Sequence, residues 1–251
     1  LQVSRRGHTS DDVRGAIKRL QAAGLQVGVQ LLPGLPGETW QTLVRTAVAI
    51  TDLQPDFARI YPVLVVENTD LADMYRAGYY QPLSLGLALR YSVFLKDWLE
   101  NHGVTVIRTG LQATEDLENN VVAGPYEPAL GELVENERWR QRLEATLLDY
   151  ETHFAPRRGL VDLKYALGHY AYHVTVSYPR SMASQVKGLG KRNAEYFKKT
   201  YPYVHWTWTS NRKSLCVVSE NDMSIVENKK KLLSKEKEVD SSVYMRIESL
   251  P

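Results

Sequence analysis

The stretch VGVQLLPGLPGET, Val27–Thr39, decides the fold of this chain. An almost continuously apolar run over Leu25–Leu32 is typical of a β-strand covered on both faces, and Pro33 and Gly34 end it. In α/β sheets ligands bind at the carboxyl ends of strands, so chemistry is expected at this turn. Either the glycines let a ligand approach the backbone, or the turn only starts the next helix.

The turn does not have the sequence of a phosphate loop. It lacks the lysine of G-x-x-x-x-G-K-[ST], and the spacing of Gly34 and Gly37 does not fit G-x-G-x-x-G. Phosphate binding is therefore not expected here.

The surrounding sequence alternates between helix and strand patterns. A capping-box start at Thr9 opens a helix that ends near Gly24, and a second helix is expected from Thr39 to Gln54. A second apolar run covers Phe57–Val66. The order helix, strand, helix, strand with short links predicts a parallel sheet wrapped by helices.

The rest of the chain predicts further helices and strands. Helices are expected from Asn68 and from Ser84, a strand in VTVIRTGLQ, and a loop feeding a helix in VVAGPYEPALGELVENERWRQRLEATL. Beyond Tyr150, YHVTVSY, VHWTWTS and SLCVVS are expected as short strands around a helix near 190–199. The charged run 229–238 is expected to be a solvated helix or a tail. A domain boundary is placed near 150–160.

Composition sets broad limits on function. The 251 residues carry 31 basic and 29 acidic side chains, so overall charge gives no drive toward nucleic acid or anionic lipid. No apolar run approaches the roughly 20 residues of a membrane helix. The one cysteine, Cys216, excludes an internal disulfide framework and an internal multi-thiolate site. It is expected to be a small buried hydrophobe, and the cytoplasm is the expected compartment.

Three motifs at their spacing identify a family. RRGHT, the strand ending in PGLPGET, and IYPVLVVENTDL resemble the radical SAM proteins related to the catalytic subunit of the Elongator complex, especially the bacterial ones. The resemblance covers residues 1 to about 147, including IRTGLQ and VVAGPYEPALGELV. It extends more weakly into QVKGLGKRNAEYFKK.

The resemblance implies an α/β fold, the carboxyl-terminal portion of a partial (β/α)6 radical SAM barrel, followed by a smaller α+β domain. Residues 1–66 would form the end of the barrel, with Val27–Leu32 as its fifth strand and Phe57–Val66 as its sixth. Residues 67–150 would be the radical SAM C-terminal extension, and residues 151–251 a small α+β domain with a basic tail.

The resemblance also implies cofactors that this chain cannot hold alone. Such enzymes bind a 4Fe-4S cluster through a CxxxCxxC loop, and the cluster binds and reductively cleaves S-adenosylmethionine (SAM). No such loop is present. The chain is therefore expected to be part of a longer radical SAM enzyme whose amino-terminal half supplies the cluster, and to be inactive and without stably bound cofactor alone. The alternative is a cluster-free module that binds RNA or protein.

The resemblance places one set of residues near the cofactor. Arginine offers a fork of donors for a carboxylate, although one of the two arginines is expected to be merely solvated. The alternatives are that His8 supports the helix start, that Leu31 is a core residue, and that Tyr61 is a packing residue whose hydroxyl reaches solvent. The cofactor-side set is Arg5, Arg6, His8, Gln30, Leu31, Pro33 and Tyr61.

Three further residues are placed on the substrate side by the same resemblance. Arg108, Gln112 and Tyr126 suit a polar substrate, although an ion pair with Glu132 would explain Arg108 equally well. No metal ligands and no catalytic residue are assigned.

A basic and aromatic segment, residues 187–213, is the candidate partner site. Seven Lys and Arg side chains with one acid, Glu195, are interleaved with Tyr196, Tyr201, Tyr203, Trp206 and Trp208. Phosphates need cations and unpaired bases need aromatic faces, so the segment fits RNA such as tRNA. The alternative is a solvated helix face beside a small β core. A membrane partner is not expected.

Overall fold

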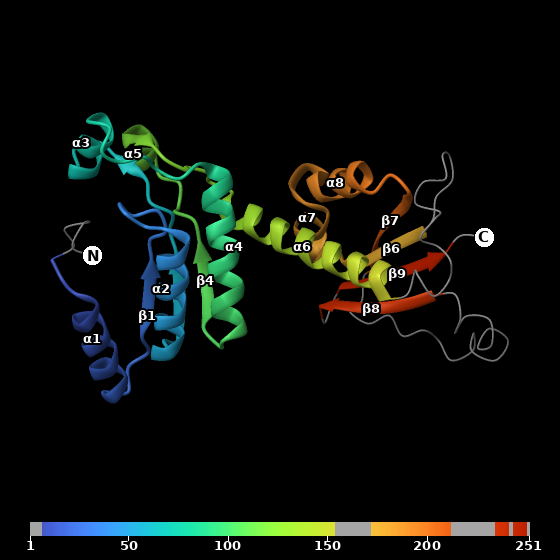
Figure 1. Ribbon diagram of the computed structural model, residues 1–251, viewed down its shortest axis with the longest axis horizontal. Helices are drawn as coiled ribbons and strands as arrows, with labels where there is room; N and C mark the ends of the chain where they lie inside the picture. The colour runs from blue at the N-terminus through green and yellow to red at the C-terminus, as the bar shows by residue number, and fades with distance from the viewer. Residues whose placement is uncertain (1–6, 154–171, 212–233, 241–242, 250–251) are drawn as a thin grey trace. The chain divides into compact units, whose positions relative to one another are not determined.

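The computed structural model describes residues 7–153, 172–211, 234–240 and 243–249, and it divides the chain into two units, 1–134 and 135–251 (Figure 1). The division falls within a long helix, whereas the sequence places a boundary near 150–160. The three expected domains stay a prediction.

The first unit alternates helices and strands as expected. Its elements in chain order are α1 (Ser10–Ala22), β1 (Gly28–Leu31), α2 (Trp40–Leu53), β2 (Phe57–Ile60), β3 (Val65–Val66), α3 (Asp70–Arg76), α4 (Leu85–Asn101), β4 (Thr105–Thr109), α5 (Glu115–Asn120), β5 (Val121–Ala123) and α6 (Leu130–His153), which continues into the second unit.

Helix starts agree with the capping patterns of the sequence. Thr9 accepts a hydrogen bond from the Asp12 N–H and donates its own N–H to the Asp12 carboxylate, so the capping box at α1 is confirmed. Thr39, Thr69 and Ser84 cap α2, α3 and α4 with their side-chain oxygens. Local sequence therefore fixes where these helices begin.

A three-stranded parallel sheet, in the order β1-β2-β4, is the centre of the first unit. Leu31 pairs with Ile60, and Ile60 pairs with Thr109, so the carboxyl ends of the three strands meet at one edge. The expected parallel pairing and the α/β class are confirmed. The six-stranded partial barrel stays a prediction.

Helices α2 and α4 pack side by side against this sheet. Leu43 and Ala47 of α2 and Leu95 and Leu99 of α4 share one buried core with β2 and β4. On the opposite face Gln30 and Arg59 are exposed, and Ile107 is 51% exposed. The expectation of a strand covered on both faces is therefore wrong in the described part of the structure, because both helices lie on the same side.

The second apolar run splits into two strands. β2 ends at Ile60, before Pro62, and Val65–Val66 forms a separate strand that pairs antiparallel with β5. A proline cannot donate to a sheet ladder, which explains the break. The expected sixth strand therefore spans Phe57–Ile60 in the sheet.

The second unit combines a sheet with helices. After the remainder of α6 come β6 (Tyr172–Pro179), a 3-10 turn (Arg180–Met182), α7 (Ala183–Lys187), a second 3-10 turn (Leu189–Lys191), α8 (Arg192–Thr200), β7 (Val204–Asn211), β8 (Ser234–Asp240) and β9 (Val243–Ser249). The sheet order is β7-β6-β9-β8, in which β6 and β7 are parallel and the other pairs antiparallel.

One core fills the second unit. Trp139, Leu143 and Leu147 of α6 pack with Val174 and Val176 of β6, and Phe197 of α8 joins them. Alternation along β6 sends these valines to the core and His173, Thr175 and Ser177 to the other face.

The described part of the charged run 229–238, residues 234–238, is a strand rather than the helix or tail expected, and residues 229–233 lie outside the described residues. Residues 234–240 form β8, an edge strand paired with β9. Charged residues are common on edge strands because they discourage further pairing, so the pattern fits a strand as well as a tail. Cys216 and SLCVVS lie outside the described residues. No helix in the described residues is long and apolar enough to cross a membrane.

Candidate functional site

The loop between β1 and α2 makes a sharp turn that requires glycine at position 34. Gly34 has φ +100°, and a Cβ there would stand 2.9 Å from Leu83 Cγ. Gly37 has φ +78°, but a Cβ there would meet nothing within 4 Å. The backbone therefore packs closely at Gly34 and is open at Gly37.

Two side chains hold the Gly34 backbone from either side. The Glu38 carboxylate accepts the Gly34 N–H at 2.5 Å, and the Tyr80 hydroxyl donates to the Gly34 carbonyl at 2.6 Å. Burial raises the pKa of Glu38, although the bond from Gly34 opposes the shift. Burial and the Glu38 charge together raise the pKa of Tyr80 to about 12. Side chains thus hold both backbone polar groups of Gly34, the N–H and the carbonyl.

Backbone hydrogen bonds carry the strand pairing past the end of the sheet. The Tyr61 N–H donates to the Leu31 carbonyl at 2.8 Å, and the Val63 N–H donates to the Pro33 carbonyl at 2.9 Å. The segment after β2 therefore runs beside the β1 loop.

Two cavities lie on either side of the β1 loop. The first has a volume of about 500 Å³ and is lined by the start of α1, the β1 end, the loop and α2, and the second, of about 330 Å³, by the loop, the segment after β2 and α3. Four residues line both: Gln30, Leu32, Leu35 and Pro36. Apolar walls with few polar groups suit a flat ring system.

The structure brings most of the described cofactor-side residues to these cavities. His8, Gln30, Leu31 and Pro33 line the first, and Tyr61 lines the second together with Gln30. Leu31 is 7% exposed and also belongs to the sheet core, so its side chain serves both environments. Arg5 and Arg6 lie outside the described residues.

The substrate-side residues form two separate contacts. The Arg108 guanidinium donates to Gln112 Oε1 at 3.4 Å, and in the part of the chain that the structure describes it makes no ion pair with Glu132, contrary to the alternative. The Tyr126 hydroxyl donates to Glu118 at 2.9 Å. Arg108 and Gln112 are therefore brought together, while Tyr126 belongs to a different contact.

Glu38 and Tyr80 are the site residues that sequence reasoning missed. Glu38 directly follows Gly37, so the sequence alone could have indicated an acidic side chain at this loop. Tyr80 lies 46 residues from Gly34, and nothing local to it indicates the contact. Among the described residues no group of three His, Cys, Asp or Glu side chains is placed to hold a metal.

The aromatic side chains of the candidate RNA segment face the interior. The Tyr196 and Tyr201 hydroxyls donate to Glu144 of α6 at 2.6 and 2.7 Å. Trp206 and Trp208 pack on Phe197, with ring centroids 4.7 and 6.1 Å away. Arg212 and Lys213 lie outside the described residues. The aromatic rings of this segment are thus used in packing against the core, and the exposed cations are not.

Comparison with known proteins identifies the class. Residues 55–140 match the Radical_SAM C-terminal domain family. This match and the relatives below confirm the expected similarity of the chain to the Elongator-like radical SAM proteins.

Individual relatives cover only part of the chain. A tRNA uridine(34) acetyltransferase of Methanocaldococcus jannaschii is 31% identical over 137 residues, 53% of this chain and 25% of that protein. One of Dehalococcoides mccartyi is 36% identical over 84 residues, 32% of this chain and 18% of that protein. The chain thus spans a quarter or less of the length of these relatives.

A solved structure was also matched, the archaeal Methanocaldococcus infernus Elp3 with N-terminus deletion (1-46). It is 28% identical and aligns with 56% of this chain and 33% of that one, at a TM-score of 0.48.

Proposed function

We propose that the first unit is the adenosine-binding part of a radical SAM enzyme that modifies RNA, with the β1 loop lying against the adenosine of SAM. The observation that carries the proposal is the pair of cavities that share the loop as a wall. On this proposal β1 and β2 are the fifth and sixth strands of a partial barrel.

The chain's own residues fit an adenosine. Leu32, Leu35 and Pro36 offer apolar surface to a flat ring, and the Gln30 amide offers both a donor and an acceptor. Glu38 and Tyr80 keep the loop in place before a ligand arrives, which lowers the entropy cost of binding.

The same residues do not fit an iron–sulfur cluster. Such a cluster needs several cysteine thiolates, and the chain contains one cysteine. Reductive cleavage of SAM is therefore assigned to a complete enzyme that supplies those thiolates, and no step of it to these residues.

RNA is proposed as the substrate because the matched relatives are named tRNA uridine(34) acetyltransferases. Acetyl transfer is not part of the function proposed for this chain. The run Gln185–Gly190 fits the R/Q-x-x-G-x-G/A pattern of acetyl-CoA loops. However, the Leu189 N–H donates to Asn136 Oδ1 at 2.5 Å and the Lys191 N–H to the Gly188 carbonyl at 2.8 Å, so two candidate pyrophosphate donors are already used.

Saturation-transfer NMR with S-adenosylhomocysteine tests the adenosine proposal, because this method detects the weak binding expected of the chain alone. The expected result is saturation of the adenine protons by the wild-type chain and its loss in Leu35→Asp, which puts a charge into both cavities.

The matched control is Leu25→Asp, since Leu25 is 56% exposed and lines neither cavity. Equal adenine signals from all three proteins, or none from the wild type, would contradict the proposal. A cluster-free binding module, the alternative, predicts no adenine signal but retained RNA binding.

A further inference from the structure

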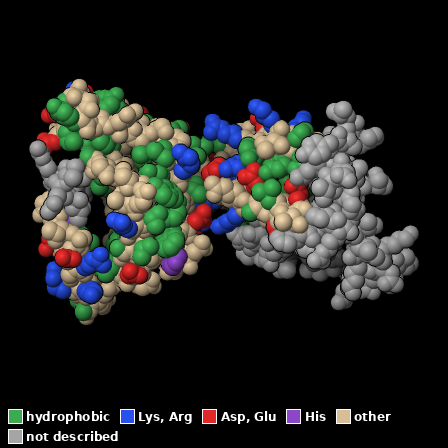
Figure 2. Space-filling model, viewed as in Figure 1, with side chains coloured by type: hydrophobic (Ala, Val, Ile, Leu, Met, Phe, Trp, Pro, Cys, Tyr) green, Lys and Arg blue, Asp and Glu red, His purple; other side chains and the backbone are tan. Residues whose placement is uncertain are grey.

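Four cations of α8 and the turn before it form an unpaired basic surface in the second unit. Lys191, Arg192, Lys198 and Lys199 are all exposed, and within the described structure none of the four makes an ion pair or a side-chain hydrogen bond. We call this set the α8 basic surface. Figure 2 shows Lys and Arg side chains gathered where α8 lies.

The arrangement follows from the helix period. At 100° per residue, Arg192, Lys198 and Lys199 fall on one exposed side of α8, and Asn193 and Phe197 fall on the buried side. Glu195 is the one acid among them. Arg192 and Lys199 are seven residues apart, about 10 Å along the axis, too far to share one phosphate.

Hydrogen bonds tie the helix that carries this surface, α8, to its neighbours. Asn193 Nδ2 donates to the Asn136 carbonyl at 2.7 Å and to the Val186 carbonyl at 3.1 Å, which ties α8 to α6 and α7. A Cβ at Gly188 would stand 2.7 Å from the Asn193 nitrogen, so the turn fits tightly there. The cations are therefore presented from a fixed backbone.

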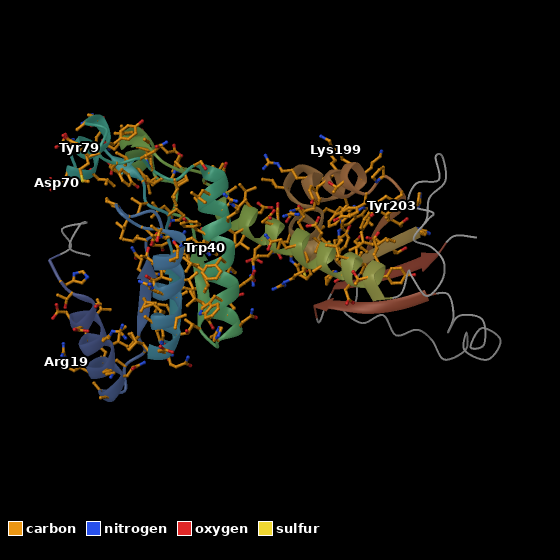
Figure 3. All side chains as sticks on the ribbon, viewed as in Figure 1. Arg19, Trp40, Asp70, Tyr79, Lys199 and Tyr203 are labelled. Atoms are coloured by element: carbon orange, nitrogen blue, oxygen red, sulfur yellow. The ribbon has the colours of Figure 1, made fainter. Side chains whose placement is uncertain are left out.

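The aromatic ring on α8 beside these cations is already occupied, because Tyr196 is partly buried and the Arg140 guanidinium lies 4.6 Å from its ring centroid. Among the Phe, Tyr and Trp side chains that the structure describes in the second unit, none is exposed, and the exposed His205 ring lies on β7 rather than on α8. Figure 3 shows Lys199 on the outer side of α8, and Tyr203, near the start of β7, donates its hydroxyl to Glu151 at 2.9 Å. Proteins that bind single strands stack bases on exposed aromatic rings, which this surface lacks.

We propose that the α8 basic surface binds the phosphate backbone of helical RNA rather than unpaired bases. Unpaired cations match phosphates, and paired RNA keeps its bases out of reach while displaying its backbone. The choice of RNA rests on the proposed function of the chain. The surface would position a folded RNA without reading its sequence.

Fluorescence anisotropy with the full chain and a labelled RNA duplex of about 16 base pairs tests this proposal. Lys191→Gln/Arg192→Gln is expected to weaken duplex binding about 10-fold and to reduce the slope of log K against log salt by about 2. Lys198→Gln/Lys199→Gln is expected to act similarly. The single strand of the same sequence is expected to bind more weakly than the duplex.

The matched control is Lys18→Gln/Arg19→Gln, which removes the same charge from exposed positions of α1. The proposal is overturned if the α8 variants bind like the wild type, if the control loses as much, or if single-stranded RNA or a DNA duplex binds more tightly. Saturation-transfer NMR with S-adenosylhomocysteine is run on the same proteins in the absence of RNA. Failure of the RNA-binding proposal can therefore be told apart from failure of the adenosine proposal.

Discussion

Gly34 is the position in the β1 loop at which a side chain is expected to cost the most stability. Gly34→Ala combines a positive φ with a 2.9 Å approach to Leu83, whereas Gly37→Ala has only the positive φ. We expect Gly37→Ala to cost about 1 kcal/mol and Gly34→Ala about 2 kcal/mol or more. Urea unfolding measures both, and equal losses would show that the contact with Leu83 is unimportant.

Glu38 gives the loop a defined pH dependence. Because burial raises its pKa in the folded state, that state binds the proton more tightly than the unfolded chain does. Ionisation of Glu38 therefore lowers stability as pH rises from the unfolded value near 4.5 through the raised folded value. Glu38→Gln keeps an acceptor for Gly34 and removes the charge.

The stability of Glu38→Gln relative to the wild type is thus expected to rise over that pH window and to be constant below it. Urea unfolding of both proteins between pH 4 and 7 gives this difference directly. A difference that does not change with pH would contradict the burial of a titrating carboxyl at this loop.

At the scale of elements, Asn193 joins three helices of the second unit. Asn193→Ala removes two hydrogen bonds and leaves the Asn136 and Val186 carbonyls without them. We expect a loss of about 2 kcal/mol in the free energy of unfolding. Lys198→Gln, on the exposed side of α8, is the control and is expected to change it by less than about 0.5 kcal/mol. Similar losses of stability in both variants would contradict a special role for the two Asn193 hydrogen bonds.

Elements set by local patterns could be predicted, and those set by distant partners could not. Capping residues and helical spacing marked α1, α2 and α4, and apolar runs marked β1, β2 and β4. The pairing of β3 with β5 and the edge strand β8 depend on tertiary contacts, which charge patterns do not reveal. Likewise Gln30 and Tyr61 were found from the loop and strand ends, whereas Tyr80 required the folded chain.

For the whole molecule, each unit has its own buried core, one around β2 and one around Phe197. We therefore expect calorimetry to resolve two unfolding transitions. Gly34→Ala should lower the midpoint of one and Asn193→Ala that of the other. A single transition lowered equally by both variants would show that the units unfold as one.

The central claim is that the β1 loop binds the adenosine of SAM, and chemical-shift mapping with S-adenosylhomocysteine tests it most directly. In amide spectra of the full chain, the account predicts concentration-dependent shifts at Leu35, which lines both cavities, at Gly37, which lines the first, and at Tyr61, which lines the second, and none over residues 172–211. Shifts confined to residues 172–211, or no shifts at millimolar ligand, would contradict it.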